Sequence, residues 1–255
     1  MSLKNSTRAA LTAVTPELML SRNTAIVGNS SRLRNSRLGA EIDRFDDVIR
    51  FNGALTEGFE QQAGSKTTLQ AIGIDLFYLF NEKYVVPVPE ASNAHKHWAR
   101  QQNAQCIHRF FPSCALLTFH PNDAERNAKN PQYLTHKYLQ DAAPDRTIHN
   151  FTESGPGSSI AYYTANRDLE ALGLESRLQH GGPRTGMKLI LRCLLSGIKP
   201  TLFGFDTDTS QEFSRHYYDD TVKAKVNNHA SHDIKGEMLV VTEIIRKGLA
   251  DAEDL

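Results

Sequence analysis

The sequence predicts an α/β fold, a single Rossmann-like domain in which helices flank a largely parallel sheet. Short apolar runs rich in β-branched residues, as at 24–27 and 47–51, end in glycine or asparagine. Such runs are typical of buried strands that stop at a tight turn. Segments with apolar residues at helical spacing lie between them, which is the order of strand–helix–strand units. The length suits one domain over residues 1–255, with 1–22 as a lead-in segment.

The other elements follow from the same two patterns. Segments with apolar residues three or four positions apart are expected to be helices, and short apolar runs bounded by Gly, Pro or Asn are expected to be strands. In chain order, we expect helices at 33–42, 94–102, 133–140, 160–172, 187–196 and from just after 232 to 245, and strands at 67–72, 84–88, 106–111 and 201–203.

The composition excludes two classes of partner. Lys plus Arg equals Asp plus Glu, at 29 each, so no overall positive field attracts nucleic acid or anionic lipid. No stretch approaches the ~18 consecutive apolar residues of a membrane span. The short apolar stretch near the N-terminus also lacks the core of a signal peptide. An anionic ligand would therefore have to be bound by a few local groups.

Two neighbouring strands each lead to an asparagine. The strand at 24–27 leads after one glycine to Asn29 and Ser30, and the strand at 47–51 leads to Asn52. In open α/β sheets, ligands bind at the carboxyl ends of the strands. A side-chain amide offers one acceptor and two donors without charge, so these residues and the backbone N–H groups of the turns suit a nucleotide monophosphate. A Rossmann-like unit in which they only form turns is the alternative.

The whole stretch from residue 24 to residue 68 resembles the large sialylmotif of the family 29 sialyltransferases. The matching segments, in order and nearly in register, are TAIVGNSS (24–31), LGAEID (38–43), DVIRFN (47–52) and GFEQQAGSKTT (58–68). A likeness over so many positions is more specific than one short motif. The resemblance implies a variant of the GT-A fold and a glycosyltransferase whose donor is CMP-sialic acid. It also implies that Asn29, Ser30 and Asn52 bind this donor.

A second site candidate is the glycine-rich segment 181–186. An apolar helical run follows it, and then a strand that ends in Gly204 and Phe205. Glycine permits a close approach of the backbone, and Thr185 supplies a hydroxyl at a helix start. The segment resembles the small sialylmotif, commonly Pro-Ser-Thr-Gly followed by a helix and Tyr-Gly-Phe. The resemblance implies that Thr185, Gly186, Gly204 and Phe205 lie near the donor.

Two local features differ from what this resemblance would give. Arg184 stands where the family commonly has serine, which either alters a donor contact or adds a charge beside the donor. Asp206 and Asp208 form an Asp-x-Asp pair after a strand, the pattern with which many nucleotide-sugar transferases bind a divalent metal. Because CMP carries less charge than a diphosphate leaving group and the pair is common by chance, we expect a solvated loop, with no metal or other cofactor.

Two histidines carry the expected chemistry. His216 begins a His-Tyr-Tyr-Asp segment that resembles the family's third motif, and beside an anion it can be protonated and donate to the donor phosphate. His232 and Glu237 match the family's His-x-x-x-x-Glu motif. This spacing places His232 just before a helix and Glu237 within its first turns. The helix N-terminus disfavours the charged imidazole, which suits a general base; His229 is the alternative base.

These sites together predict an inverting glycosyltransferase. It would move sialic acid from CMP-sialic acid to a hydroxyl of a glycan acceptor, with His232, His216 and Glu237 as the catalytic residues. Two other hypotheses are transfer of another CMP-linked acid sugar, such as Kdo, and a non-catalytic relative that binds nucleotide or glycan. A metal-dependent transferase would rest on the aspartate pair alone. The donor is expected to bind to Asn29, Ser30, Asn52, Thr185, Gly186, Gly204 and Phe205.

The cysteines bear on the cellular compartment. Cys106, Cys114 and Cys193 match no metal motif, and an odd number gives no disulfide framework. The animal enzymes that the chain resembles join the two sialylmotifs by a disulfide, and the matching positions here are Thr24 and Gly197. Since both cysteines are replaced, we expect the reducing cytoplasm of a bacterium, with peripheral attachment to the inner membrane as a variant. A Golgi-type anchor outside these residues is the alternative.

Overall fold

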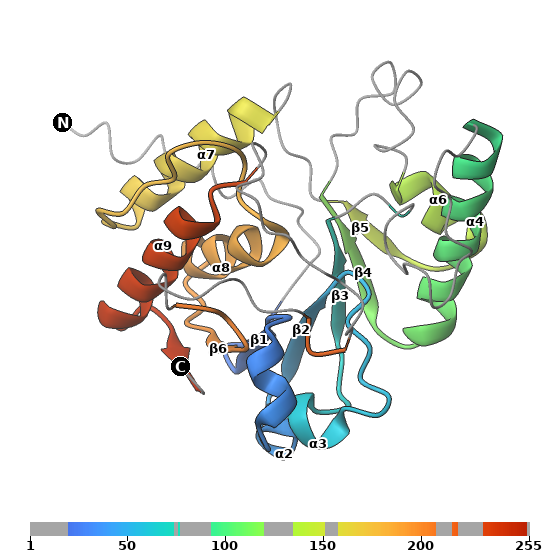
Figure 1. The fold of residues 1–255 in the computed structure, drawn as a ribbon, viewed down its shortest axis with the longest axis horizontal. Coiled ribbons are helices and arrows are strands. Elements are labelled where there is room, and N and C mark those ends of the chain that lie inside the picture. Colours follow the sequence, from blue (N-terminus) through green and yellow to red (C-terminus); the bar gives the residue numbers. More distant parts are fainter. Residues whose placement is uncertain are drawn as a thin grey trace.

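The protein is built on one parallel sheet (Figure 1). The computed structural model describes residues 20–73, 76, 93–119, 135–150, 158–207, 216–218 and 232–253. Within them, seven strands pair in the order β5-β4-β3-β2-β1-β6-β7, and every pair is parallel. The predicted α/β class is therefore confirmed. The strands are β1 (Thr24–Val27), β2 (Asp47–Phe51), β3 (Leu69–Ile72), β4 (Ala115–Thr118), β5 (Ile148–Asn150), β6 (Thr201–Phe203) and β7 (Asp251–Ala252).

Helices cover both faces of this sheet. Helices α7, α8 and α9 lie together, whereas α4 and α6 pack on each other at the β4–β5 end (Figure 1). Three short helical segments follow the first two strands. In chain order the helical elements are η1 (Ser31–Asn35), α2 (Gly39–Ile42), α3 (Glu60–Ala63), α4 (Asn93–Phe110), α6 (Thr135–Ala142), α7 (Ser158–Ala171), α8 (Thr185–Leu195) and α9 (Ile234–Arg246).

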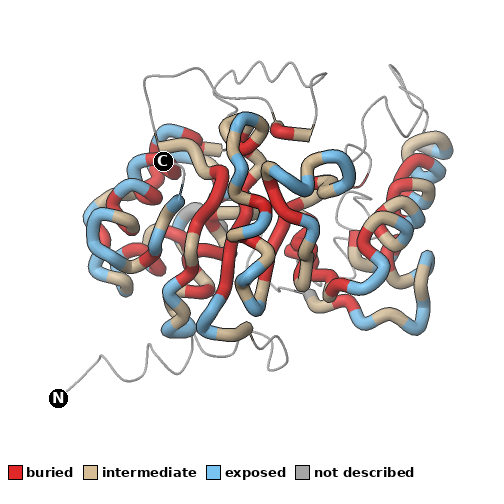
Figure 2. Tube along the Cα trace, turned by 90° about the horizontal axis from the view of Figure 1, so that it is seen from below, coloured by how far each residue is buried: buried red, intermediate tan, exposed pale blue. Residues whose placement is uncertain are grey.

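Burial on both faces explains the unbroken apolar runs of the central strands. Alternate residues of a strand point to opposite faces of a sheet. Ile26 belongs to the apolar core that includes residues of α7, α8 and α9, while Ala25 and Val27 belong to the core under η1, α2 and α3. A strand that is covered on both sides needs no polar face. Figure 2 shows the sheet as the continuously buried centre of the molecule.

The strand predicted at 106–111 is wrong, because these residues continue helix α4 to Phe110. Ala104, Ile107 and Phe111 are buried, and their spacing of three and four is helical. The short run of Ile and Phe resembles a strand by itself, but together with the preceding residues it continues the helical spacing. The prediction also missed β4, β5 and β7, which are four, three and two residues long. The strand expected at 84–88 lies outside the described residues.

The order of the strands reverses at β1. The chain adds β2 to β5 on one side of β1 and then returns to place β6 on the other side. In open α/β sheets such a switch point leaves a crevice beyond the carboxyl ends of the two strands, where ligands bind. Val27 pairs with Phe203 at these ends. The two residues that follow, Gly28 and Gly204, therefore stand at the mouth of the crevice.

Thr24 and Gly197, which the resemblance matches to the family disulfide, have other local roles. The Thr24 hydroxyl donates to the carbonyl oxygen of Ser21 over 2.7 Å. Gly197 follows helix α8 with φ of +75°, a conformation that favours glycine. The cysteines at 106, 114 and 193 are free thiols, the last two of them buried.

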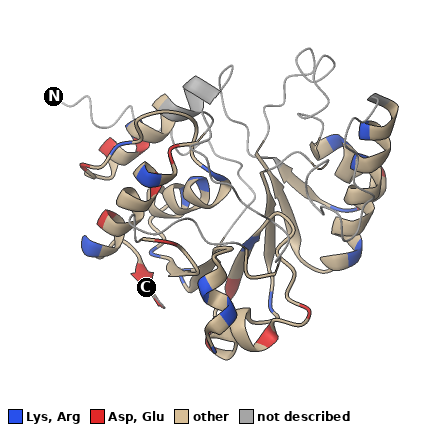
Figure 3. Cartoon of the chain, in the orientation of Figure 1, with Lys and Arg blue, Asp and Glu red and all other residues tan. Residues whose placement is uncertain are grey.

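Most charged residues belong to the helices and loops around the sheet (Figure 3), although the buried Arg50 lies in β2. Lys and Arg are interspersed with Asp and Glu along the described chain, in agreement with equal numbers of each sign. Among the helices of the described residues, none is long and apolar enough to cross a bilayer.

Glu243 joins helix α9 to the loop that leads towards α8. Its carboxylate accepts hydrogen bonds from the backbone N–H groups of Glu175 and Ser176, at 2.9 and 2.7 Å. It also forms an ion pair with Lys247 at 3.1 Å. Burial acts to raise the pKa of Glu243, but the hydrogen bonds from Ser176 and Glu175 outweigh it and lower the pKa to about 2. The ionised carboxylate therefore stabilises the folded state.

We predict that Glu243→Gln lowers the free energy of unfolding at neutral pH by about 1–3 kcal/mol, the usual value of hydrogen bonds to a charged group. A lowered folded-state pKa contributes stability above the unfolded pKa, and this contribution is lost as the pH falls towards 2. The difference between variant and wild type should therefore shrink between about pH 4 and pH 2. Urea denaturation at several pH values measures it. Glu170→Gln, at an exposed position, is the matched control; an equal loss at all pH values would contradict the assignment.

Candidate active site

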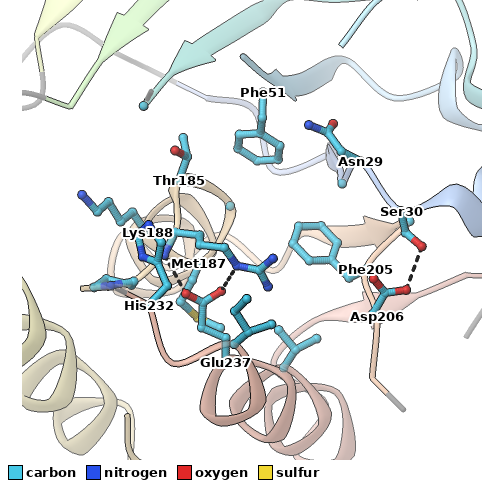
Figure 4. Close-up of a pocket in the computed structure, with 18 of the residues that line it drawn as sticks. Asn29, Ser30, Phe51, Thr185, Met187, Lys188, Phe205, Asp206, His232 and Glu237 are labelled. Carbon is cyan, nitrogen blue, oxygen red and sulfur yellow. Dashed lines mark hydrogen bonds and ion pairs between the residues drawn. The ribbon is translucent and has the colours of Figure 1, made fainter. Parts of the chain in front are cut away.

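A cavity of about 400 Å³ opens at the switch point of the sheet. Its walls come from the turns after β1, β2, β3 and β6, from the start of α8, from α9, and from the segment 216–218. All ten residues of the predicted donor and catalytic sites line this one cavity, and Figure 4 labels six of them. These residues are Asn29, Ser30, Asn52, Thr185, Gly186, Gly204, Phe205, His216, His232 and Glu237.

The turns after β1 and β6 contact each other through their backbones. The Gly28 N–H group donates to the Phe203 carbonyl oxygen at 2.7 Å, and the Ser30 N–H group donates to the Gly204 carbonyl oxygen at 3.2 Å. A Cβ atom on Gly28 would overlap that Gly204 carbonyl. Gly204 itself has φ of +62°. Glycine at these two positions therefore lets segments from both sialylmotifs form one floor of the cavity.

The two asparagines present different groups to the cavity. Asn29 donates through Nδ2 to the Tyr218 hydroxyl at 3.3 Å, and its buried Oδ1 has no partner among the described residues. Asn52 has φ of +55°, and its Oδ1 accepts the Gly73 N–H group at 3.0 Å. This bond aims the side chain along the strand ends and leaves Nδ2 without a described partner. The site thus offers an acceptor at Asn29 and a donor at Asn52.

Thr185 and Gly186 bring helix α8 up to the strand ends. A Cβ atom at Gly73 would overlap the Thr185 hydroxyl, so the bare glycine gives this side chain its space. A Cβ atom at Gly186 would lie 3.1 Å from the Phe205 ring. Phe205 and Phe51 contribute aromatic rings to the apolar part of the wall (Figure 4). The helix N-terminus consequently faces the cavity at close range.

Tyr217 anchors the segment that carries His216. Its side chain is fully buried, and its hydroxyl donates to the Leu55 carbonyl oxygen at 3.0 Å. Its backbone N–H group donates to Asn29, and its carbonyl oxygen accepts Nε and Nη2 of Arg34 at 3.0 and 2.8 Å. Burial raises the pKa of Tyr217, so the hydroxyl keeps its proton for the bond to Leu55.

His216 is positioned by this anchor. Its backbone forms an antiparallel bridge with Ser30, and its ring stacks on Tyr218 with centroids 5.1 Å apart. A ring so placed is fixed beside the Asn29 turn, although 187 positions separate the two residues in the sequence, from 29 to 216. The imidazole lines the cavity on the side of β1.

His232 enters from the opposite end of the chain, just before helix α9. Its backbone bridges to Gly181, and Nδ1 lies 2.6 Å from the Gly182 carbonyl oxygen. A carbonyl oxygen only accepts, so Nδ1 carries the hydrogen. In the neutral ring, Nε2 then holds a free lone pair, the tautomer that a general base requires.

Asp233 caps helix α9 and connects it to the same loop. Its Oδ1 accepts the Gly236 N–H group at 2.9 Å, and its Oδ2 accepts the Gln179 N–H group at 2.6 Å. The cap satisfies one of the free donors at the helix start. Because Gln179 lies close in sequence to Gly182, the cap also fixes the carbonyl that orients His232.

Both carboxylate oxygens of Glu237 bind Arg184. Its Oε1 accepts the backbone N–H group of Arg184 and its Oε2 accepts Nε of the same residue, both at 2.7 Å (Figure 4). The side chain of Glu237 is only 4% exposed, whereas that of Arg184 is 49% exposed. Glu237 thus ties α9 to the N-cap residue of α8. Both carboxylate oxygens are already engaged in this pairing.

Asp206 is held by Ser30. The Ser30 hydroxyl donates to Oδ1 of Asp206 at 2.7 Å and accepts the Arg32 N–H group at 3.2 Å. Asp208, the other member of the Asp-x-Asp pair, lies outside the described residues, as does His229. Among the residues that the structure describes, no group of three His, Cys, Asp or Glu side chains could hold a metal ion.

Phe51, Met187 and Lys188 are among the wall residues that the sequence did not indicate as site residues. Lys188 stands four positions after Arg184, so both lie on the same side of α8. Its Nζ atom lies 5.6 Å from the centroid of the Phe119 ring. Helical spacing from Arg184 could have indicated Lys188, and the position just before Asn52 could have indicated Phe51.

The chain matches a known protein family over most of its length. The family model described as glycosyltransferase family 29 (sialyltransferase) matches residues 6–112 and 160–249. The chain belongs to this sialyltransferase family. Both matched parts contain wall residues of the cavity, and together they include all the predicted site residues. The recognition of the family from its sialylmotifs is therefore confirmed.

Individual members of the sialyltransferase family are distant in sequence. Alpha-N-acetylgalactosaminide alpha-2,6-sialyltransferase 1 of Mus musculus is 28% identical over 243 residues, which cover 88% of this chain and 42% of the relative. The type 2 enzyme of the same name from Mus musculus is 26% identical, with 88% and 58% covered. The chain thus spans about half the length of these relatives.

Solved structures of the family show the same fold. A mammalian sialyltransferase in complex with Gal-beta-1-3GalNAc-ortho-nitrophenol aligns with a TM-score of 0.50 and 21% identity, covering 98% of this chain and 79% of that one. A second crystal structure of a mammalian sialyltransferase aligns with a TM-score of 0.51 and 20% identity, covering 98% and 78%. At this identity the likeness concerns the fold.

Proposed function

We propose that this protein is an inverting sialyltransferase that moves sialic acid from CMP-sialic acid to a hydroxyl of a glycan acceptor. The observation that supports it is the convergence of all the predicted donor and catalytic residues on one cavity at the switch point of the sheet. Family membership supports the same class of reaction. The bacterial cytoplasmic location remains an expectation from the missing disulfide positions.

The donor nucleotide would bind across the strand ends. Nδ2 of Asn52 and the Asn29 turn offer hydrogen-bond donors for a phosphate without a metal ion. His216 lies on the same side and can donate to the phosphate as CMP departs. Phe205 and the glycine turns at 186 and 204 would contact the cytidine and the sugar.

His232 would act as the general base. In the neutral ring, the bond between Nδ1 and the Gly182 carbonyl oxygen places the free lone pair on Nε2, which can take the proton of an acceptor hydroxyl. The hydroxyl oxygen then attacks the anomeric carbon from the face opposite the phosphate. The bond to the phosphate oxygen breaks with its electron pair, and the configuration at the anomeric carbon inverts. Glu237 would contribute by holding Arg184 rather than by proton transfer, since both its oxygens are engaged.

Binding of cytidylates tests the donor assignment. We predict that CMP at about 100 times its Kd raises the melting temperature by about 5–10 °C, because ligand binding stabilises the folded state by about 2.7 kcal/mol there. CMP-sialic acid should also stabilise the protein, and a UDP-sugar should not. Asn52→Asp keeps the shape but adds a negative charge beside the phosphate, so it should reduce the CMP shift. Asn23→Asp, at an exposed position, is the control. Stabilisation by the UDP-sugar alone would overturn the proposal, and a shift confined to CMP-Kdo would favour a Kdo transferase.

For the base, we predict that His232→Ala lowers turnover by about 10²- to 10⁴-fold, the usual contribution of general base catalysis. The affinity for CMP should change little, because the proposed role concerns the acceptor. Transfer assays and calorimetry with CMP measure the two effects separately. His180→Ala, at an exposed position outside the cavity wall, is the matched control. Normal turnover in the His232 variant would remove it from the mechanism.

We also propose that transfer needs no metal ion, because Ser30 holds Asp206 and hydrogen-bond donors suffice for a monophosphate. Activity should therefore persist in EDTA. A loss of activity that manganese restores would instead support the metal-dependent alternative with Asp206 and Asp208.

A further inference from the structure

The polar side chains of the cavity include two separate sets. Ser30 and Asp206 lie on the side of β1 and β6, whereas Glu237 and His232 lie together on the side of α9 (Figure 4). His216 belongs to the first set through its backbone bridge to Ser30. The proposed phosphate contacts belong to the first set. The second set contains the proposed base and one cation that the mechanism has not used, Arg184.

Arg184 is held in place by Glu237 through only part of its guanidinium group. Glu237 binds the backbone N–H group and Nε, and the nearly complete burial of this carboxylate fixes the plane of the guanidinium. The terminal atoms Nη1 and Nη2 have no hydrogen-bond partner among the described residues, and half of the side chain is exposed. Arg184 lines the cavity. It therefore presents a fork of donors whose geometry matches a carboxylate.

Further positive potential surrounds this fork. Arg184 is the N-cap residue of α8, which runs for 11 residues, so the positive end of the helix dipole lies beside it. Lys188 follows one turn later on the wall of the cavity. Glu237, the carboxylate in contact with Arg184, accepts from Nε and not from the terminal nitrogens. An anion that enters on this side would therefore find unmatched donors.

The position of Arg184 relative to the base identifies the anion. The Gly182 carbonyl that orients His232 lies two residues before Arg184, and Glu237 lies on the first turns of the helix that His232 precedes. The base must face the anomeric carbon of the donor. In a sialic acid, this carbon carries the carboxylate directly, whereas the phosphate leaves on the opposite side.

We propose that Arg184 binds the carboxylate of the donor sugar and that Glu237 is its positioning residue. This inference rests on the proposed sialyltransferase function. It makes Arg184 the residue that selects a donor sugar with a carboxylate. Serine at this position in the resembling motif offers one neutral hydroxyl, whereas Arg184 offers a charged, bidentate contact. The protein should accordingly discriminate between acid sugars and neutral sugars at this residue.

Calorimetry with CMP and with CMP-sialic acid, without acceptor, tests the contact with Arg184. Arg184→Gln should weaken the affinity for CMP-sialic acid by about 10- to 100-fold, the effect of losing hydrogen bonds to a charged group. The affinity for CMP, which lacks the carboxylate, should stay within about twofold of wild type. Arg184→Ser should behave in the same way. Arg246→Gln, at an exposed position of α9, is the matched control for both ligands.

The outcomes separate the inference from the function on which it rests. An equal loss for CMP and CMP-sialic acid, or no loss for either, would overturn the carboxylate contact while leaving the sialyltransferase proposal in place. A wild-type protein that binds neither ligand would overturn both.

Glu237 variants test the positioning role. Glu237→Gln keeps one oxygen that can accept from Arg184, so it should retain more of the preference for CMP-sialic acid over CMP than Glu237→Ala. A purely structural role would instead lower the melting temperature and the affinities for both ligands. The ratio of the affinity for CMP-sialic acid to that for CMP would then stay unchanged.

Discussion

The site depends on the close backbone contact between the turns that follow β1 and β6. The Gly28 N–H group reaches the Phe203 carbonyl oxygen, and the space between the strand ends admits no Cβ atom at Gly28. This contact brings together segments that lie about 175 positions apart in the chain, as the bond from Ser30 to Asp206 shows. Since parallel strands end at one edge, pairing β1 with β6 creates the crevice, and glycine keeps it from being filled.

Buried polar side chains then set the position of each segment around that crevice. Tyr217 is fully buried and fixes the segment of His216, Asp233 caps α9 and holds the loop before α8, and Glu237 ties α9 to Arg184. An unpaired polar group in such places would cost free energy, so each of these bonds also specifies one geometry. The residues that would meet the ligand are therefore oriented by neighbours that do not, as precise sites require.

Membership of the sialyltransferase family and the local differences from its usual motifs fit the same framework. The backbone contacts of the two sialylmotifs do not depend on the side chain at position 184, which lies at the helix N-cap and points into the cavity. A change of serine to arginine there leaves the sheet and the switch point intact while it alters the charge beside the proposed base. In the same way, Thr24 forms a hydrogen bond and Gly197 ends a helix at the two positions that the resemblance matches to the family disulfide. The fold tolerates these changes because the core, rather than these positions, holds the strands together.

The sequence by itself determined the α/β class, the strands β1, β2, β3 and β6, and the identities of the residues around the cavity. These follow from local apolar patterns and from motifs that are continuous in the chain. It did not determine β4, because Ala and Leu favour helices, or β5 and β7, because Ile-His-Asn and Asp-Ala contain no apolar run. It misassigned the end of α4 because the helical spacing begins well before Cys106. Only the tertiary structure decided that Asn29 and His216 are neighbours, that Glu237 binds Arg184, and which nitrogen of His232 carries the proton. Each of these facts depends on side-chain and backbone atoms from distant segments, whose distances are set by packing of the whole sheet and not by any local preference of the chain.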